Sequence, residues 1–385
     1  GLKMSVYLDY NATAPIDSRV LETMVDAYKN HYGNADSRTH DFGNDSREIV
    51  EKARGQVAQL LNVSKGEVFF TSGATESTNI AILGLQEYGE QTGKKHIVTT
   101  SIEHKAVINA ARHLEKYGFS VECVSPDATG RISAEDVLNR VREDTLLVSV
   151  MHVNNETGVI QPVHEIGQAL AEKNVLFHVD ATQSCGKLVK ELQTLNYNML
   201  SIGAHKLSGP QGIGALILKK RRYKLPPVQA ITFGGAQEHG LRPGTLPTAL
   251  IAGMGKACEI ALAEYEQNNA HCAALKEIVL QELSNSGLKY EINGNPTYCV
   301  PNTINFSIDG ISSEALMLAS KQYCGISNGS ACNSHDYSAS YVLTSMKLNP
   351  DRIESAVRIS WGPNIAPEVF AASIHELLSV AKEML

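Results

Sequence analysis

Short apolar runs alternate with helical patterns over the first two-thirds of the chain. The runs that predict strands span residues 68–71, 96–100, 146–150, 175–179, 199–202 and 213–218. They are apolar at nearly every position instead of every second one, which is typical of strands in a mostly parallel sheet that is buried on both faces. The alternation of strands with helices predicts an α/β fold.

The pattern changes beyond residue 232. A segment rich in glycine and proline is followed by two predicted helices and two predicted strands, in the order 232–247, 249–266, 273–284, near Tyr290 and 303–307. We therefore predict a large domain over residues 15–258 and a smaller α+β domain formed by residues 1–14 and 259–385. Residues 6–8 are expected to pair with the smaller domain or to lie near the bound ligand.

Length and composition narrow the function without identifying it. A chain of 385 residues is long enough for two domains. The net charge of −7 argues against a basic surface that grips nucleic acid, and no apolar run approaches the roughly 18 residues that span a bilayer. We therefore expect a cytoplasmic protein that binds neither a membrane nor nucleic acid directly.

The seven cysteines favour a free thiol over a disulfide framework. Their number is odd, they are widely spaced and no CxxC pair occurs, so neither a disulfide network nor a zinc site is indicated. Most are expected to be small buried residues, and one of them to be reactive.

Polar residues follow the predicted strands, at the edge of an open α/β sheet where ligands bind. Gly73 and Thr75 open a helix after the strand at 68–71. They suit a phosphate because a helix N-terminus offers free N–H groups, although the same pattern is common in ordinary helix caps. Asp180 ends the strand at 175–179. It either caps a helix or pairs with a protonated pyridine nitrogen, which would keep such a ring an electron sink.

A lysine and a histidine complete this set. Lys206 lies just past the strand at 199–202 and before the glycine-rich residues 207–212, a suitable place for a Schiff-base lysine, with a solvated surface lysine as the alternative. His104 follows the strand at 96–100, where an imidazole can stack on a flat ring and shuttle protons, or can be purely structural. Four such features at strand ends are hard to explain as separate accidents, so they predict one shared ligand site.

Further motifs extend over nearly the whole chain. The segments that carry them are residues 7–15, 70–77, 103–107, 151–158, 178–183, 242–245, 328–332 and 357–360. In this order they resemble the cysteine desulfurases of the NifS/IscS group, which have the aspartate-aminotransferase-like fold type I. The resemblance implies a mostly parallel seven-stranded sheet in the large domain, a smaller α+β domain, and pyridoxal 5′-phosphate (PLP) as the cofactor.

The resemblance assigns a role to each residue of the shared site. It implies that Lys206 forms the Schiff base with the cofactor, while Asp180 faces the pyridine nitrogen and Gln183 the ring oxygen. His104 would stack on the ring, and either Lys206 or His104 would move the Cα proton of the substrate. Asn155 would lie beside the ring and the substrate. The phosphate would be held by Ala74, Thr75 and His205.

Three further residues carry the remaining implied roles. Thr245 is similar to the threonine that reaches the neighbouring subunit's phosphate, which implies a homodimer with shared active sites. Arg358 resembles the arginine that binds the substrate carboxylate in a bidentate grip. Cys332 matches the nucleophile that takes the sulfur of L-cysteine as a persulfide, releases L-alanine and passes the sulfur to an acceptor protein. The small and polar residues around it, about 324–338, predict a loop that swings between cofactor and surface.

The chain departs from the usual pattern of this group in three places. Gly203 stands where the group usually has a serine that contacts the phosphate, and Pro243 also replaces a serine. The residues that follow Cys332, at positions 333–335, differ as well. His335 would lower the pKa of the Cys332 thiol if it points at it, and is otherwise a solvated loop residue.

Residues 33–40, 156–162 and 241–247 resemble the desulfurases of bacterial DNA phosphorothioation systems (DndA-like or SspA-like). This implies that partner proteins carry the sulfur to the DNA backbone, and the acidic net charge fits delivery to a protein. The alternatives are a general sulfur donor for iron–sulfur scaffold proteins and tRNA thiolation, a selenocysteine lyase, and a non-catalytic protein that keeps the fold. Cys332 argues against the lyase, and the cofactor residues together with Cys332 argue against the non-catalytic protein.

Overall fold

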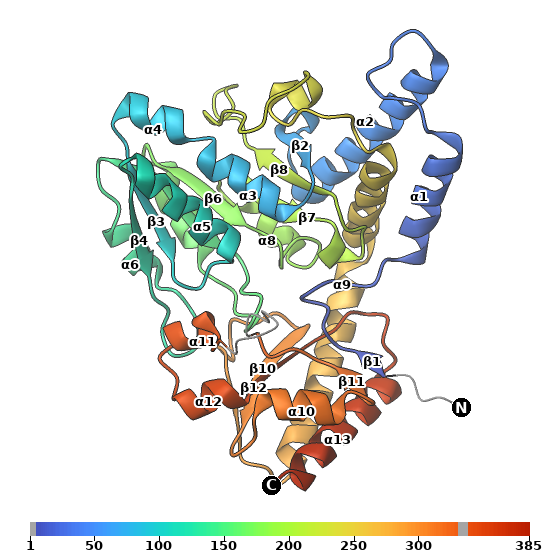
Figure 1. The fold of residues 1–385 in the computed structure, drawn as a ribbon, viewed down its shortest axis with the longest axis vertical. Helices are drawn as coiled ribbons and strands as arrows, with labels where there is room; N and C mark the ends of the chain where they lie inside the picture. Colours follow the sequence, from blue (N-terminus) through green and yellow to red (C-terminus); the bar gives the residue numbers. More distant parts are fainter. Residues whose placement is uncertain (1–4, 330–337) are drawn as a thin grey trace.

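The computed structural model describes residues 5–329 and 338–385, and its larger part is built around a seven-stranded sheet (Figure 1). In the order of neighbouring strands, the sheet consists of β2 (Val68–Thr71), β8 (Gly214–Leu218), β7 (Met199–Gly203), β6 (Leu176–Asp180), β5 (Thr145–Met151), β3 (His96–Thr100) and β4 (Ser120–Val124). Strand β8 is antiparallel to both of its neighbours, and the other strands pair in parallel. The mostly parallel sheet expected from the apolar runs is therefore confirmed.

Both faces of this sheet are covered by helices, which explains why its strands are apolar at most positions. Phe69 and Ile97 pack on one face against α3 (Ala74–Leu83), α4 (Gln86–Thr92) and α5 (Lys105–Leu114). Phe70 and Val98 point to the other face, because successive side chains of a strand alternate. The helices on that face are α2 (Asp41–Leu61), α6 (Ala134–Asn139), α7 (Val163–Ala171) and α8 (Val189–Thr194).

One long helix, α9 (Thr248–Asn285), joins the larger part to the smaller one (Figure 1). The two separate helices predicted at 249–266 and 273–284 are wrong, because α9 continues for 38 residues. No glycine or proline interrupts residues 267–272, and the apolar face passes from one core to the other there: Cys258 packs in the large core and Cys272 in the small one. Helix α1 (Ser18–Asn30) packs against the first half of α9. Among the described residues, no helix is both long enough and apolar enough to cross a membrane.

The smaller part contains an antiparallel sheet with helices beside it. The sheet has the order β12 (Ala356–Ser360), β10 (Thr303–Ile308) and β9 (Tyr290–Ile292), and the helices are α10 (Ser313–Ser320), α11 (Tyr341–Ser345), α12 (Pro350–Ser355) and α13 (Pro367–Glu383). Strand β1 (Val6–Tyr7) pairs in parallel with β11 (Cys324–Gly325), so the start of the chain joins this part, as one of the two expectations had it. The proposed boundary at residue 258 falls inside α9 and stays a prediction.

Candidate active site

A cavity of about 590 Å³ opens where the strands of the large sheet end. The loops after β2, β3, β5, β6 and β7 all contribute side chains to it, as expected for an open α/β sheet. It brings together most of the residues singled out from the sequence: Ala74, Thr75, His104, Asn155, Asp180, Gln183, His205 and Lys206.

One end of the cavity is formed by the N-terminus of α3. Helix α3 begins at Ala74, directly after Gly73, and a Cβ added at Gly73 would meet no atom of the described residues within 4 Å. The Glu76 carboxylate accepts a hydrogen bond from the backbone N–H of Ser72, which fixes the turn between β2 and α3. The first N–H groups of a helix and its dipole favour an anion. A Cβ at Gly203 would lie 3.5 Å from the backbone nitrogen of Ala74, which is an ordinary contact distance, so a side chain would fit there beside the helix start.

Asp180 and Lys206 lie at the ends of neighbouring strands. Asp180 is the last residue of β6 and accepts a hydrogen bond from the backbone N–H of Thr182 at 3.0 Å. Lys206 follows β7, on a short 3-10 turn (His205–Leu207), and no described residue accepts a hydrogen bond from its amine. Burial lowers the pKa of Lys206 to about 8, while the charge of Asp180 acts to raise it. The amine is therefore more often neutral near pH 7 than that of an ordinary lysine.

The two histidines of the cavity are held by local contacts. His104 caps the N-terminus of α5, where its Nδ1 accepts a hydrogen bond from the backbone N–H of Ala106 at 3.1 Å. Burial lowers the pKa of His104, so the ring is neutral and carries its proton on Nε2. His205 lies 3.0 Å from the Thr13 hydroxyl through its Nδ1, and burial lowers its pKa as well.

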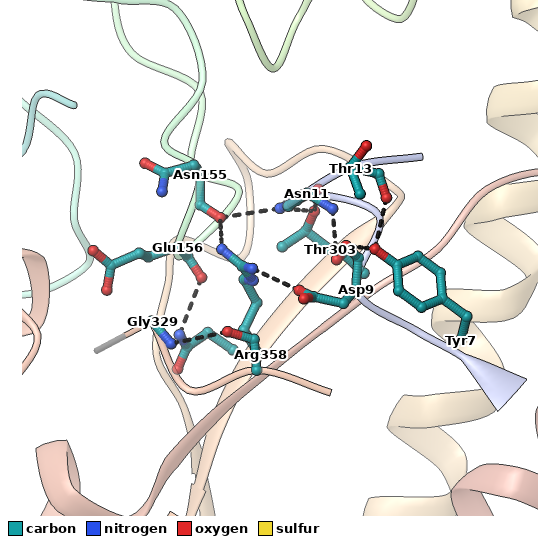
Figure 2. A network of polar contacts seen from close by, with 12 residues as sticks. Tyr7, Asp9, Asn11, Thr13, Asn155, Glu156, Thr303, Gly329 and Arg358 are labelled. Carbon is teal, nitrogen blue, oxygen red and sulfur yellow. Dashed lines mark hydrogen bonds and ion pairs between the residues drawn. The ribbon is translucent and has the colours of Figure 1, made fainter. Parts of the chain in front are cut away.

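The segment after β1 runs beneath the cavity, and its contribution was missed by the sequence interpretation. Asn11 is buried, and its amide donates to the backbone oxygen of Asn155 and to the Thr303 hydroxyl, both at 3.0 Å (Figure 2). Gln183 donates to the backbone oxygen of Asn11 at 3.1 Å. Thr13 lines the cavity itself. Residues 7–15 were matched only as a motif, and no signal in the sequence marks Asn11 as a buried polar contact, because its partner Thr303 lies far away along the chain.

Arg358 lies on β12 and contacts Asn155, which lines the cavity (Figure 2). These two residues are called the Asn155–Arg358 wall below. One terminal nitrogen donates to the backbone oxygen of Asn155 at 2.9 Å, and the other pairs with Asp9 at 2.7 Å. The Nε of Arg358 and the side-chain oxygen of Asn155 are both buried and have no hydrogen-bond partner among the described residues. Because unpaired buried polar atoms are costly, these two atoms are suited to meet a bound ligand.

Two described residues with implied roles, Thr245 and Arg358, are not among the residues that line the cavity. Thr245 is exposed. Cys332 lies outside the described residues, as do Asn333, Ser334 and His335.

Comparisons with known proteins place the chain in a family. Residues 6–368 match the family model of class-V aminotransferases. A cysteine desulfurase IscS of Colwellia psychrerythraea is 43% identical over 364 residues, which cover 94% of this chain and 89% of that protein. The crystal structure of DndA from Streptomyces lividans has a TM-score of 0.80 at 41% identity and covers 93% of this chain and 99% of that one. The chain belongs to the class-V aminotransferase family, among its cysteine desulfurases.

A second similar structure bears on the substrate of this desulfurase family. It is described as SspA in complex with cysteine, and it has a TM-score of 0.80 at 33% identity. The match covers 94% of this chain and all (100%) of that one. The resemblance of the motifs to the NifS/IscS group, and the fold expected from it, are thus confirmed.

The cavity fits PLP, the cofactor of this family. The open backbone at Gly73 and the start of α3 suit the phosphate. Lys206 offers an amine that no described residue has engaged, and the Asp180 carboxylate lies at the adjacent strand end. The unpaired amide oxygen of Asn155 is available to the ring or to the substrate. When bound, the cofactor supplies an electron sink for the charge that develops at the substrate Cα.

Proposed function

We propose that this desulfurase converts L-cysteine to L-alanine, holds the sulfur on Cys332 as a persulfide, and passes it to an acceptor protein for DNA phosphorothioate modification. The observation that carries the proposal is the single cavity that joins the Lys206 amine, the Asp180 carboxylate and the start of α3. Asp180 would face the pyridine nitrogen, and Ala74, Thr75 and His205 would hold the phosphate.

The substrate would be oriented at the wall of Asn155 and Arg358. The guanidinium of Arg358 donates one hydrogen bond to Asn155 and one to Asp9, so its Nε–H and the second N–H of each terminal nitrogen remain to attract a carboxylate. The neutral amine of Lys206 is suited to take the Cα proton, since its pKa is lowered to about 8. The neutral His104 ring, with its proton on Nε2, would stack on the cofactor and can assist proton transfer.

The sulfur transfer itself would be carried out by Cys332. Its thiolate attacks the sulfur of the substrate, so an S–S bond forms while the Cβ–S bond breaks. The substrate Cβ takes up a proton and leaves as the methyl group of alanine. The persulfide on Cys332 then passes its outer sulfur to a thiol of the acceptor protein, and the Cys332 thiol is restored.

A homodimer is part of this proposal. Thr245 is exposed and lies outside the cavity of its own chain, which suits a residue that reaches the phosphate of a partner. Its loop is tied to the cavity by Arg242, whose Nε donates to the Glu76 carboxylate at 2.9 Å. A cytoplasmic location fits as well, because a nucleophilic thiol must stay reduced and the described cysteines are free.

The choice of pathway rests on the motifs at 33–40, 156–162 and 241–247, with the likeness to DndA and SspA in support. The acidic net charge of −7 favours delivery to a protein over direct contact with DNA. The second candidate is general sulfur supply for iron–sulfur clusters and tRNA thiolation. It is favoured by the 43% identity to an IscS, which is close to the 41% shared with DndA.

Deletion of the gene in the native host separates the two pathways. The proposal predicts that phosphorothioate linkages, measured by nuclease digestion and mass spectrometry of the DNA, disappear and return with the intact gene but not with Cys332→Ser. Iron–sulfur enzyme activity and thiolated tRNA should stay at their normal levels. Phosphorothioate at the normal level, or a host without any, would exclude this pathway, and a fall in thiolated tRNA would favour general sulfur supply.

A further inference from the structure

The segment that carries Cys332, between Gly329 and Ser340, is called the thiol segment below. Both of its described ends meet one buried carboxylate, that of Glu156. On one side the chain is described up to Gly329, and a Cβ there would lie only 2.5 Å from Oε1 of Glu156. On the other side the Ser340 hydroxyl donates a hydrogen bond to the same Oε1. Glu156 is 3% exposed, and Gly329 has a φ of 72°, so position 329 excludes other residues both by conformation and by space.

The backbone around Glu156 is held by hydrogen bonds, and one of them also joins Asn155 to Arg358. Its N–H donates to the Asn154 side chain at 2.8 Å, and its carbonyl accepts from the Asn305 amide at 3.0 Å. The preceding carbonyl, that of Asn155, accepts from Arg358 at 2.9 Å. Figure 2 shows the Glu156 side chain pointing away from Arg358, on the opposite side of this short stretch of backbone. In this stretch, Asn155 therefore contacts Arg358, and the next residue, Glu156, contacts both ends of the thiol segment.

Two further contacts tie those ends to the active site. Before the segment, Ser327 exchanges two backbone hydrogen bonds with Arg358, of 2.6 and 3.2 Å. After it, the Tyr341 hydroxyl donates to the backbone oxygen of Glu103 at 2.5 Å, directly before His104. The contacts of Ser340 and Tyr341 thus continue from the thiol segment to the cavity loops after β5 and β3.

We propose that Glu156 is a positioning residue that sets both ends of the thiol segment against the Asn155–Arg358 wall, and so aims Cys332 at the substrate sulfur. This inference rests on the proposed role of Cys332. It gives Glu156 no contact with the cofactor or with the reacting atoms, and it predicts an effect on sulfur transfer rather than on substrate binding.

The charge of Glu156 is less important to this role than its shape and its acceptor oxygen. Burial raises the pKa of Glu156 to about 7, against the opposing influence of the Ser340 hydrogen bond and of the charges of Arg358 and Lys105. A neutral carboxyl group is therefore populated near neutral pH. The uncharged amide of glutamine keeps the volume and an acceptor oxygen, so it should serve as a conservative replacement.

The first test compares Glu156→Ala with Glu156→Gln in the cofactor-loaded full-length protein. The readout is the rate at which L-cysteine puts a persulfide on Cys332 in a single turnover, measured by mass spectrometry. Glu156→Ala should slow this step about 10-fold or more, because small misplacements of a reacting group cost rate steeply. The cofactor absorption and the KM for cysteine should stay unchanged. Glu156→Gln should keep the rate within about threefold.

Glu67→Ala is the matched control for loss of a buried glutamate. Glu67 is also buried and bonds a serine hydroxyl, that of Ser64 at 2.9 Å, but it does not line the cavity. It should lower thermal stability without slowing persulfide formation. An equal slowing by Glu67→Ala and Glu156→Ala would reduce the role of Glu156 to general stability and overturn the proposal.

Gly329 provides a second test that leaves Glu156 in place. Gly329→Ala inserts a methyl group against the Glu156 carboxylate, whereas Gly287→Ala has the same backbone cost, at a φ of 76°, with no atom within 4 Å. Gly329→Ala should slow persulfide formation, and Gly287→Ala should only destabilise the protein slightly. Equal rates in the two variants would contradict the proposal, even if Glu156→Ala does not fold.

The double variant Glu156→Ala/Ser340→Ala tests whether the two residues act as one unit. It should be no slower than Glu156→Ala alone, because both changes remove the same contact. Ser340 also caps α11, so Ser133→Ala, which removes a comparable cap from α6, controls for that loss. If the losses in rate caused by the two single changes multiply in the double variant, Glu156 and Ser340 do not act as one unit. If the unaltered protein forms no persulfide on Cys332, the proposed function itself fails; if it does and Glu156→Ala matches it, only the positioning role fails.

Discussion

The residues that would hold the cofactor (the cofactor side) and the segment that would carry the sulfur (the sulfur side) are built in different ways. Lys206 and Asp180 follow directly on neighbouring strands of a sheet that is buried on both faces. The ends of the thiol segment, at Gly329 and Ser340, are instead set by a contact with Glu156, which is more than 170 residues away in sequence (|i−j| of 184 for Ser340).

The difference follows from what each side has to do. A cofactor stays in one place, so the stiff ends of buried strands are a suitable support for the groups that hold it. A thiol that takes sulfur at one place and delivers it at another belongs on a connecting segment. The desulfurase thus combines a preformed cofactor cavity with a segment anchored at the Asn155–Arg358 wall.

Lys206→Ala should have the largest effect and should fall on the cofactor side alone. Without the amine, alanine formation should drop by about 10³-fold or more. The visible absorption of the bound cofactor should be lost, while alkylation of Cys332 by iodoacetamide should keep its normal rate. A parallel loss of Cys332 reactivity would mean that the two sides are not independent.

Asp180→Asn tests the electrostatics of the cofactor side. Loss of a charge-assisted hydrogen bond of about 1.5–3 kcal/mol should lower alanine formation about 10- to 100-fold. Since the Asp180 carboxylate acts to raise the pKa of Lys206, its removal should move that pKa below the present value of about 8. The amine captures the cofactor only when neutral, so capture by the apo-protein should then reach its half-maximal rate at a lower pH. A midpoint that rises instead would contradict this assignment.

Arg358→Lys should affect the place where the two sides meet. A lysine cannot reproduce the planar set of donors that contacts Asn155 and Asp9 and would also reach the substrate. The KM for cysteine should rise about 10-fold, with the cofactor absorption unchanged. Arg142→Lys, at an exposed arginine paired with Asp144, is the control and should leave KM unaltered. An unchanged KM in Arg358→Lys would remove Arg358 from substrate binding.

Gly203→Ser should have the smallest effect, and in the opposite direction. A Cβ at this position would lie at an ordinary distance of 3.5 Å from the Ala74 nitrogen, so a serine hydroxyl can reach the phosphate end of the cavity. One added hydrogen bond should tighten cofactor binding about 2- to 10-fold, measured by equilibrium titration of the apo-protein. Weaker binding would show that this end of the cavity is already filled.

The cofactor side was predictable from the sequence because its signals are local. The runs at 68–71 and 96–100 coincide with β2 and β3, and Asp180, Lys206 and His104 were found because they follow such runs. Three strands were missed, namely β4, β12 and the two-residue β11. Strands β4 and β12 lie at sheet edges, and β4 is only partly buried, so its apolar signal is weak.

The contacts of the sulfur side could not be predicted in the same way. Asn11 and Glu156 owe their importance to partners that lie far away in sequence, namely Thr303 and Ser340. No spacing or periodicity marks such contacts, because they arise only when the two parts of the molecule pack together. The break expected in α9 was wrong for a related reason, since the helix changes from one core to the other at that point.

The most direct test of the account is mass spectrometry of the cofactor-loaded protein after one turnover with L-cysteine, for the unaltered chain and for Cys332→Ser. In the unaltered protein we expect one added sulfur on the Cys332 peptide and an equal amount of alanine. Cys332→Ser should show neither, although its cofactor absorption stays normal. Undiminished alanine release by Cys332→Ser, or a persulfide on another cysteine, would contradict the central claim that Cys332 accepts the sulfur.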